Sequence, residues 1–250
     1  MGREILETLT DAERQRYGRQ MLIAGWGEEA QRRLKAATVF VAGAGGLGSP
    51  VSVALAVAGV GTLRICDCDA PELSNLNRQF LHDDTRLGMN KAESARLTLS
   101  RTNPHVRVEA LPFRIEAANV DDLIGNADIV VDCMDNFPTR YVLNTAAVRK
   151  RIPFVHGSIW GLEGRVTFLH APETPCLACV FQGTPPPEVF PVLGATSAIT
   201  GALQAMEVLK YLAAVGSLLK GRLLCCDYRD MRFFEVKVRR NPACTVCAAA

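Results

Sequence analysis

Short apolar runs alternate with amphipathic stretches through the middle of this chain. The apolar runs lie at residues 39–42, 63–66, 106–111, 129–131 and 154–156, and turn or helix-capping residues flank them. Uninterrupted runs of this length are typical of strands that are buried on both faces of a sheet. Helical spacing lies between them, at 49–58, 90–102 and 138–150. Strands that alternate with helices of this length predict an α/β fold with a doubly wound, mostly parallel sheet.

The two ends of the chain show different patterns. Residues 3–35 have helical spacing with breaks near Gly25 and Gly27, which predicts short helices. Residues 166–169 and 233–238 are predicted to form antiparallel strands. In the second of these, apolar and charged residues alternate, so one face should be buried. The helix predicted at 198–213 should bury an apolar face made of Ile199, Leu203, Met206 and Leu209. We predict one continuous domain over 1–250, divided into 1–35, 36–160 and 161–250.

Composition and charge narrow the class of protein. The chain has 250 residues, of which 48% are hydrophobic and 22% are charged, so it is neither disordered nor collagen-like. Its 28 basic and 26 acidic residues give a net charge of +2, which does not favour nucleic acid as the main partner. The charged N-terminal segment does not resemble a signal peptide. The longest apolar stretch, 50–63, is shorter than the roughly 20 residues of a membrane span. We therefore expect a soluble, cytoplasmic protein.

A glycine-rich turn follows the first predicted strand and opens the first helix of the core. Its glycines are Gly43, Gly45, Gly46 and Gly48 in a GxGxxG pattern. Such a turn brings backbone N–H groups at a helix start close to a phosphate. Asp67 ends the second strand, where a carboxylate can accept hydrogen bonds from ribose hydroxyls. A turn that serves packing alone would leave Asp67 and Asp69 unexplained. The order of these elements predicts a Rossmann-like nucleotide-binding core over 36–160.

The residues after Asp69 favour a nucleoside triphosphate over a dinucleotide. Residues 74–80 are rich in polar side chains, and Lys91 follows at the start of the next helix. Cations and amides gathered here would neutralise a triphosphate better than a dinucleotide pyrophosphate requires. The residues that we expect to contact the nucleotide are Asn75, Arg78, Gln79 and Lys91. The chain contains no GxxxxGK[ST] run, so a P-loop is excluded.

A further pair of acids follows the fourth predicted strand. Asp135 lies just beyond the end of this strand, where ligands of parallel sheets bind, and it can hold Mg²⁺ on phosphates. The alternative role for Asp135 is to cap the helix predicted at 138–150. Asp132, still at the end of the strand, is predicted to be structural.

Nine cysteines are the unusual feature of the composition. Four of them form two CxxC pairs, Cys176 with Cys179 and Cys244 with Cys247. Two such pairs suit tetrahedral Zn²⁺ and predict a structural zinc knuckle, whereas a single pair could be a redox site. Cys66 and Cys133 lie in or beside buried strands, where a thiol packs as a small apolar group. The four histidines lack metal-ligand spacing, so we expect surface or strand-edge roles for them.

Together these motifs resemble those of the MoeB/ThiF/HesA family, the bacterial relatives of ubiquitin-activating enzymes. The resemblance covers nearly the whole chain, at residues 16–20, 43–48, 74–79, 132–136 and 203–207 and at the four paired cysteines. It implies ATP-dependent adenylation of the C-terminal glycine of a small ubiquitin-fold sulfur carrier ending in Gly-Gly, with release of pyrophosphate. The carrier, rather than this chain, decides whether the sulfur enters molybdopterin, thiamine, a thiolated tRNA or an amino acid.

The resemblance also implies roles for individual residues. Asp67 would bind the ribose and Asp135 would bind Mg²⁺, while phosphate contacts would come from Asn75, Arg78 and Lys91. Arg19 would reach the phosphates in the site of a partner subunit in a homodimer. Its alternative role is that of a solvated helix residue. The four paired cysteines would hold zinc in a carrier-binding part at 161–250.

One departure from the family pattern limits the expected chemistry. Relatives that form a thioester or persulfide have a cysteine between the first CxxC pair and the long helix, but residues 180–199 contain none. We therefore expect a reaction that ends at the acyl-adenylate. The alternatives are adenylation of the kind carried out by tRNA threonylcarbamoyladenosine dehydratases, an NAD-dependent oxidoreductase, and a carrier-binding scaffold without activity. The two cysteine pairs and the near-neutral charge count against tRNA adenylation, and an oxidoreductase would need an acid–base pair for hydride transfer that is not evident. A scaffold would not need Arg78, Lys91 and Asp135 together.

Overall fold

A computed structural model describes residues 7–183 and 191–248. Within these residues, eight strands form one sheet in the order β3-β2-β1-β4-β5-β6-β7-β8. The strands are β1 (Thr38–Ala42), β2 (Thr62–Cys66), β3 (Arg107–Leu111), β4 (Ile129–Asp132), β5 (Phe154–Trp160), β6 (Glu163–Leu169), β7 (Arg222–Asp227) and β8 (Arg232–Lys237). Strands β1 to β5 pair in parallel, and β6 to β8 extend the sheet with antiparallel pairs. The predicted fold class, a mostly parallel sheet with antiparallel C-terminal strands, is confirmed.

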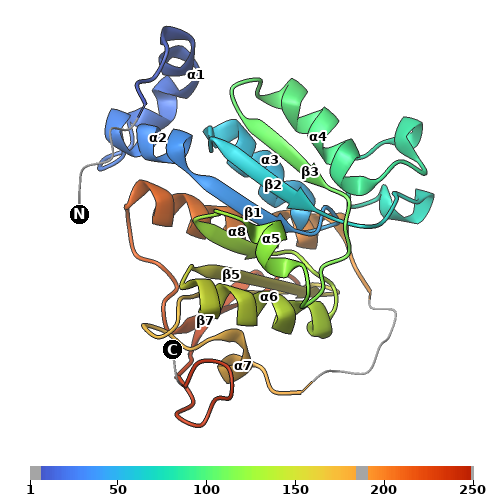
Figure 1. The fold of residues 1–250 in the computed structure, drawn as a ribbon, viewed down its shortest axis with the longest axis vertical. Helices are drawn as coiled ribbons and strands as arrows, with labels where there is room; N and C mark the ends of the chain where they lie inside the picture. The colour runs from blue at the N-terminus through green and yellow to red at the C-terminus, as the bar shows by residue number, and fades with distance from the viewer. Residues whose placement is uncertain (1–6, 184–190, 249–250) are drawn as a thin grey trace.

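Helices cover both faces of the parallel part of the sheet (Figure 1). The helices are α1 (Asp11–Met21), α2 (Gly27–Ala36), α3 (Gly48–Ala58), α4 (Lys91–Thr102), α5 (Val120–Ile124), α6 (Phe137–Lys150), α7 (Leu177–Val180) and α8 (Gly194–Ala213), with 3₁₀ turns η1 (Leu73–Asn75) and η2 (Asp84–Arg86). Along β1, Val39 and Val41 pack into the core beneath α3, α4 and α8, whereas Phe40 and Ala42 pack beneath α5 and α6. This alternation explains why the strand contains only apolar residues beyond its first position.

The chain reverses its direction of winding at β1. From β1 it proceeds outward to β2 and β3, and then returns to place β4 and β5 on the other side of β1. The connections on the two sides therefore separate at the carboxyl ends of β1 and β4. In open parallel sheets a crevice forms at this position, and ligands bind there. No helix in the described residues is both long and apolar enough to cross a membrane.

One prediction about the C-terminal third is wrong in part, and another is wrong. In α8, Leu203 and Leu209 are partly buried and pack against the core as predicted, but Met206 is 53% exposed and Ile199 37% exposed, and most of the fully buried positions are small or polar. The reason is close packing, because a Cβ on Gly201 would lie 2.4 Å from Pro50 of α3. In β8 both faces are exposed, Phe234 included. This strand forms the edge of the sheet, and no helix in the described ranges covers it.

Candidate active site

The glycine turn joins β1 to α3 at the point where the winding reverses. Gly43 has a φ of +99°, and a Cβ on it would lie 2.8 Å from the carbonyl oxygen of Cys133. A Cβ on Gly48 would lie 2.0 Å from the carbonyl oxygen of Gly43. These two glycines therefore permit the turn itself, while Gly45 and Gly46 line the adjoining cavity. Among the described residues, no side chain caps α3. The N–H groups of Ser49 and Val51 donate to the carbonyl oxygens of Gly45 and Leu47, and Pro50 has no N–H, so the Gly48 N–H is the one in this first turn that an anion could use.

Asp67 connects the end of β2 to this turn. Its Oδ2 accepts a hydrogen bond from the Ala44 N–H at 2.8 Å, and its Oδ1 accepts one from the Asp69 N–H at 2.9 Å. Burial raises the pKa of Asp67, although these two hydrogen bonds and the charge of Lys91 oppose that shift. Asp67 thus fixes the shape of the turn as well as lining the cavity.

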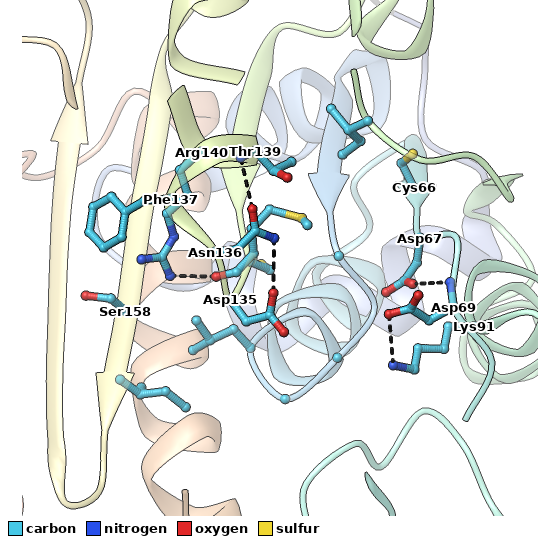
Figure 2. Close-up of a pocket in the computed structure, with 18 of the residues that line it drawn as sticks. Cys66, Asp67, Asp69, Lys91, Asp135, Asn136, Phe137, Thr139, Arg140 and Ser158 are labelled. Atoms are coloured by element: carbon cyan, nitrogen blue, oxygen red, sulfur yellow. Dashed lines mark hydrogen bonds and ion pairs between the residues drawn. The ribbon is translucent and has the colours of Figure 1, made fainter. Parts of the chain in front are cut away.

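A cavity of about 870 Å³ opens at the carboxyl ends of the parallel strands, and its volume lies in the usual range for small-molecule sites. The nucleotide residues predicted from sequence that line it are Gly43, Gly45, Gly46, Asp67, Asp69, Arg78, Gln79, Lys91 and Asp135. In Figure 2, Asp67, Asp69 and Lys91 lie on one side of the glycine turn, and Asp135, Asn136 and Arg140 lie on the other. Gly48, Asn75 and Arg19 are not among the lining residues.

Two predicted cations are held by local structure around the cavity. Lys91 is the first residue of α4, its side chain is 10% exposed, and its Nζ lies 3.8 Å from Asp69 Oδ2. Arg78 follows η1, and its Nη1 donates hydrogen bonds to the carbonyl oxygen of Ser74 at 2.9 Å and to Asn77 Oδ1 at 3.0 Å. Asn75 instead supports the 3₁₀ turn, because its Oδ1 accepts a hydrogen bond from the Glu72 N–H at 3.4 Å.

Asp135 lies between β4 and α6, and the structure excludes its alternative role as a helix cap. The N-cap of α6 is Asn136, whose Oδ1 accepts a hydrogen bond from the Thr139 N–H at 3.0 Å. The side chain of Asp135 accepts a hydrogen bond from Asn136 Nδ2 at 3.2 Å and lines the cavity. It is therefore available to a ligand of the cavity.

A second group of lining residues was not predicted from the sequence. These are basic and aromatic side chains from several elements, namely Phe113, Arg114, Phe137, Arg140, Trp160, Arg165 and Phe181. With them, five basic and three acidic side chains line the cavity, which suits an anion. Phe113 and Arg114 directly follow the third predicted strand, and their position could have identified them. The others come from α6, from the β5–β6 hairpin and from the segment after α7, which no local sequence signal brings together.

Two histidines are buried, contrary to the expectation of surface or edge positions. His82 contacts the carbonyl oxygen of Ala44 through Nε2 at 2.9 Å and Ser94 Oγ through Nδ1 at 2.9 Å. Because a carbonyl only accepts, Nε2 carries the proton and stabilises the glycine turn. His156 donates from Nδ1 to Asp132 Oδ2 at 2.6 Å. Burial lowers the pKa of both imidazoles below 6.5, so both are neutral at pH 7.

This arrangement predicts a loss of stability in mild acid. The unfolded chain binds protons at its histidines near pH 6.5, but the folded chain resists protonation of His82 and His156. The two histidines should therefore make their full contribution to the free energy of unfolding above pH 6.5. At lower pH the free energy of unfolding should decrease, by up to about 1.4 kcal/mol per pH unit for each histidine. Urea unfolding between pH 7.5 and 5.5 measures this slope. The slope should be smaller in His156→Gln, and an equal slope in that variant would contradict the assignment.

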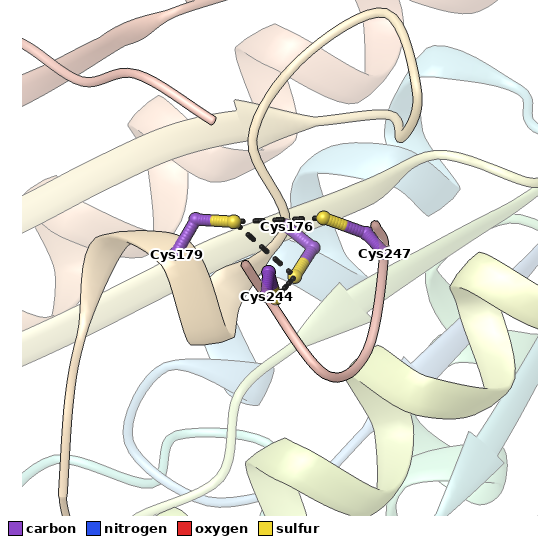
Figure 3. Close-up of side chains that lie close together, drawn as sticks. All are labelled: Cys176, Cys179, Cys244 and Cys247. Carbon is purple, nitrogen blue, oxygen red and sulfur yellow. Dashed lines mark hydrogen bonds between the residues drawn. The ribbon is translucent and has the colours of Figure 1, made fainter. Parts of the chain in front are cut away.

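The four paired cysteines meet between the start of α7 and the loop after β8 (Figure 3). The Sγ atoms are 3.9 Å apart in the pair Cys176–Cys179, 3.7 Å in Cys176–Cys244 and 3.5 Å in Cys179–Cys247. All four lie within 4.8 Å of one another, and none forms a disulfide. Four sulfurs at about 2.3 Å from a tetrahedral ion would lie about 3.8 Å apart. The cluster therefore has the donors and the spacing to hold a metal ion.

Comparison with known proteins agrees with this geometry. Residues 17–246 match the model of the ThiF family. The sulfur carrier protein adenylyltransferase of Thermus thermophilus is 43% identical over 95% of this chain and 92% of its own length. The SAMP-activating enzyme E1 of Haloferax volcanii is 44% identical over 93% of this chain and 88% of its own.

A solved structure and a group of longer relatives complete the comparison. The crystal structure of E. coli MccB with MccA-N7isoASN matches this chain with a TM-score of 0.84 and 24% sequence identity. The match covers 93% of this chain and 74% of the MccB chain, and it shows that the two folds are alike. The chain spans only 56% of the length of relatives such as the adenylyltransferase and sulfurtransferase MOCS3 of Drosophila yakuba. The family match over residues 17–246 and the two full-length bacterial and archaeal relatives show that this chain belongs to the ThiF family.

Proposed function

We propose that this protein uses ATP to adenylate the C-terminal glycine of a small ubiquitin-fold sulfur carrier that ends in Gly-Gly. The observation that carries the proposal is the cavity where the winding reverses. It combines the glycine turn and Asp67 with five basic side chains and the carboxylate of Asp135, which lines the cavity. The names of the Thermus and Haloferax relatives, which refer to a sulfur carrier and to SAMP activation, support the choice of substrate.

The proposed chemistry needs charge neutralisation more than acid–base catalysis. The carboxylate of the carrier is itself the nucleophile: it forms a bond to the α-phosphorus of ATP while the bond to pyrophosphate breaks. Because two anions approach each other, positioning and nearby cations lower the barrier. Asp67 would hold the ribose, and Arg78 and Lys91 would stabilise the charge on the phosphates. Asp135 would hold Mg²⁺, which supplies further positive charge when bound.

The thiols around the cavity support a reaction without a covalent cysteine step. Burial raises the pKa of the Cys66 thiol to about 12 and that of Cys133 well above its usual range. Burial and the neighbouring Asp69 also raise the pKa of Cys68. A thiol that stays protonated is a poor nucleophile. Together with the lack of cysteine in residues 180–199, this supports release of the acyl-adenylate to another protein that supplies sulfur.

The same proposal includes a homodimer, a zinc ion and a cytoplasmic location. Arg19 is exposed on α1 and does not line the cavity of its own chain, as expected if it acts in the site of a partner subunit. Leu22, which follows α1, is 82% exposed, and Ile23 is exposed beside it, so this end of the helix offers an apolar surface to a second copy. Zinc at the cysteine cluster would fix the C-terminal part, 161–250, where the carrier binds.

Exchange of labelled pyrophosphate into ATP tests the proposed function. We expect exchange with a ubiquitin-fold carrier ending in Gly-Gly and only background exchange with the same carrier shortened by its last glycine. Parallel reactions contain tRNA, or NAD⁺ with the carrier. Exchange that depends on tRNA would support a tRNA-adenylating enzyme instead, and formation of NADH would support an oxidoreductase. Carrier binding without any exchange would indicate a scaffold.

A further inference from the structure

A buried charged cluster lies directly beneath the loop that carries Asp135. Asp132 ends β4 and is fully buried. Its Oδ1 accepts a hydrogen bond from the Met134 N–H at 3.1 Å. Its Oδ2 accepts one from His156 Nδ1 at 2.6 Å and lies 3.5 Å from Arg140 Nε. The carbonyl oxygen of Asp132 in turn accepts a hydrogen bond from Gln204 Nε2 of α8 at 2.8 Å. The carboxylate is thus fixed from several elements.

Arg140 extends this cluster to the cavity. Its side chain is 7% exposed, and its Nη2 donates hydrogen bonds to the carbonyl oxygens of Met134 at 2.5 Å and Gly157 at 3.3 Å. Its guanidinium carbon lies 5.0 Å from the centre of the Phe137 ring, close enough for a cation–π contact. Figure 2 shows Arg140 on the same side of the glycine turn as Asp135.

Both polar groups of the Met134 backbone are therefore bound by one ion pair. Asp132 holds its N–H and Arg140 holds its carbonyl, which is part of the peptide bond that leads into Asp135. The direction of the Asp135 side chain depends on the plane of that peptide. A buried ion pair is weak evidence for stability, because apolar residues of similar volume often replace it without loss. Its value here is geometric, because the rigid guanidinium holds Nη2 between the carbonyl oxygens of Met134 and Gly157 while Nε faces Asp132.

We infer that Arg140 is a positioning residue, held in place by Asp132 and His156, that orients the Met134–Asp135 peptide so that Asp135 presents its carboxylate to a divalent cation on the nucleotide. This inference rests on the proposed function, which assigns a metal–nucleotide complex to the cavity. Arg140 does not itself need to contact the cation. A lysine at this position would keep a positive charge near Asp132, but its single ammonium group cannot occupy both the Nη2 position between the two carbonyls and the Nε position beside Asp132.

The test compares Arg140→Lys with a matched control on the same helix. Arg149→Lys changes an exposed arginine that pairs with exposed Asp121 at 2.6 Å, away from the cavity. Binding of Mn²⁺ is titrated by electron paramagnetic resonance in the presence of a non-hydrolysable ATP analogue, and binding of the analogue alone is measured by calorimetry. Arg140→Lys and Asp135→Asn should each weaken Mn²⁺ binding at least about tenfold, and Arg140→Lys should leave the affinity for the metal-free analogue unchanged. Arg149→Lys should match the wild type.

A double variant distinguishes a positioning role of Arg140 from an effect of its charge and from a failure to fold. Asp132→Asn with Arg140→Met removes both buried charges, so it should fold even if single changes do not. It should bind Mn²⁺ as weakly as Arg140→Lys and show a carrier-dependent exchange rate about 10²-fold below wild type. Wild-type Mn²⁺ binding in either variant, while Asp135→Asn is impaired, would overturn the inference. A wild-type protein that binds the metal–nucleotide complex but shows no exchange would instead overturn the proposed function.

Discussion

Arg78→Ala and Lys91→Ala are each expected to slow carrier-dependent pyrophosphate exchange by about 10²–10³-fold. The two side chains approach the cavity from different elements, Lys91 from the start of α4 and Arg78 from the segment after η1. In the proposed reaction, negative charge accumulates between the carrier carboxylate and the triphosphate as the new bond forms. Loss of one fixed cation removes stabilisation that is stronger in the transition state than in the ground state, so the maximum rate should fall more than the affinity for ATP.

The fold should tolerate both changes. Asp69, the partner of Lys91, is 66% exposed and stays hydrated when the lysine is removed. The hydrogen bonds of Arg78 go to its own turn and contribute little to the core. The melting temperature should therefore change by no more than about 4 °C. Arg149→Ala, which removes an exposed cation outside the cavity, is the control and should keep full activity. Wild-type exchange in Arg78→Ala or Lys91→Ala would contradict the assignment.

The same variants test whether Arg19 acts in the site of a partner subunit. Arg19→Ala alone should be slow. When it is unfolded and refolded together with Arg78→Ala, mixed dimers should contain one complete site, formed by Arg78 of one chain and Arg19 of the other. Activity should then recover to roughly a quarter of the wild-type value if the chains pair at random. No recovery in a mixture shown to contain mixed dimers would place Arg19 outside the site.

The elements that sequence analysis located correctly are those whose environment is set locally. An apolar run such as 129–131 must be buried on both faces, and only a central parallel strand offers that environment. The faces of α8 and β8 depend on their neighbours instead. Met206 points outward because Gly201 and the small residues around it bring α8 close to α3. Phe234 is exposed because no described element covers the edge strand.

In the candidate site, too, the residues predicted from the sequence are those whose positions are set locally. Asp67 and Asp135 were predicted because each directly follows a parallel strand, and all such ends meet at one edge of a sheet. Arg140 was missed because its position depends on Asp132 of β4 and on Gly157 of β5. No spacing along the chain reports those contacts. Asn75 matched a motif, but in the structure its side chain supports the turn that presents Arg78.

At the proposed zinc site, replacing Cys247 with serine should remove most of the zinc that purifies with the protein and lower the melting temperature by about 10 °C or more. The reason lies in the composition of the local core. The buried residues there are Ala171 and three of the four cysteines, so little apolar surface holds the C-terminal loop against the rest of the chain. Besides the contacts within this small cluster, metal–sulfur bonds to the four cysteines would connect α7 to the segment after β8.

Loss of the metal should also disturb the cavity. This second effect distinguishes a structural metal from one that binds incidentally. Phe181 lines the cavity and directly follows α7, whose N-cap is Cys176. Loss of zinc should therefore also reduce carrier-dependent exchange, and added zinc should not restore it in Cys247→Ser. Cys225→Ser is the matched control, because that thiol lies in β7 outside the cluster. Elemental analysis measures the zinc content, and calorimetry measures the melting temperature. Less than one zinc per chain in the natively purified protein, or an unchanged zinc content in Cys247→Ser, would show that the cluster is not a structural zinc site.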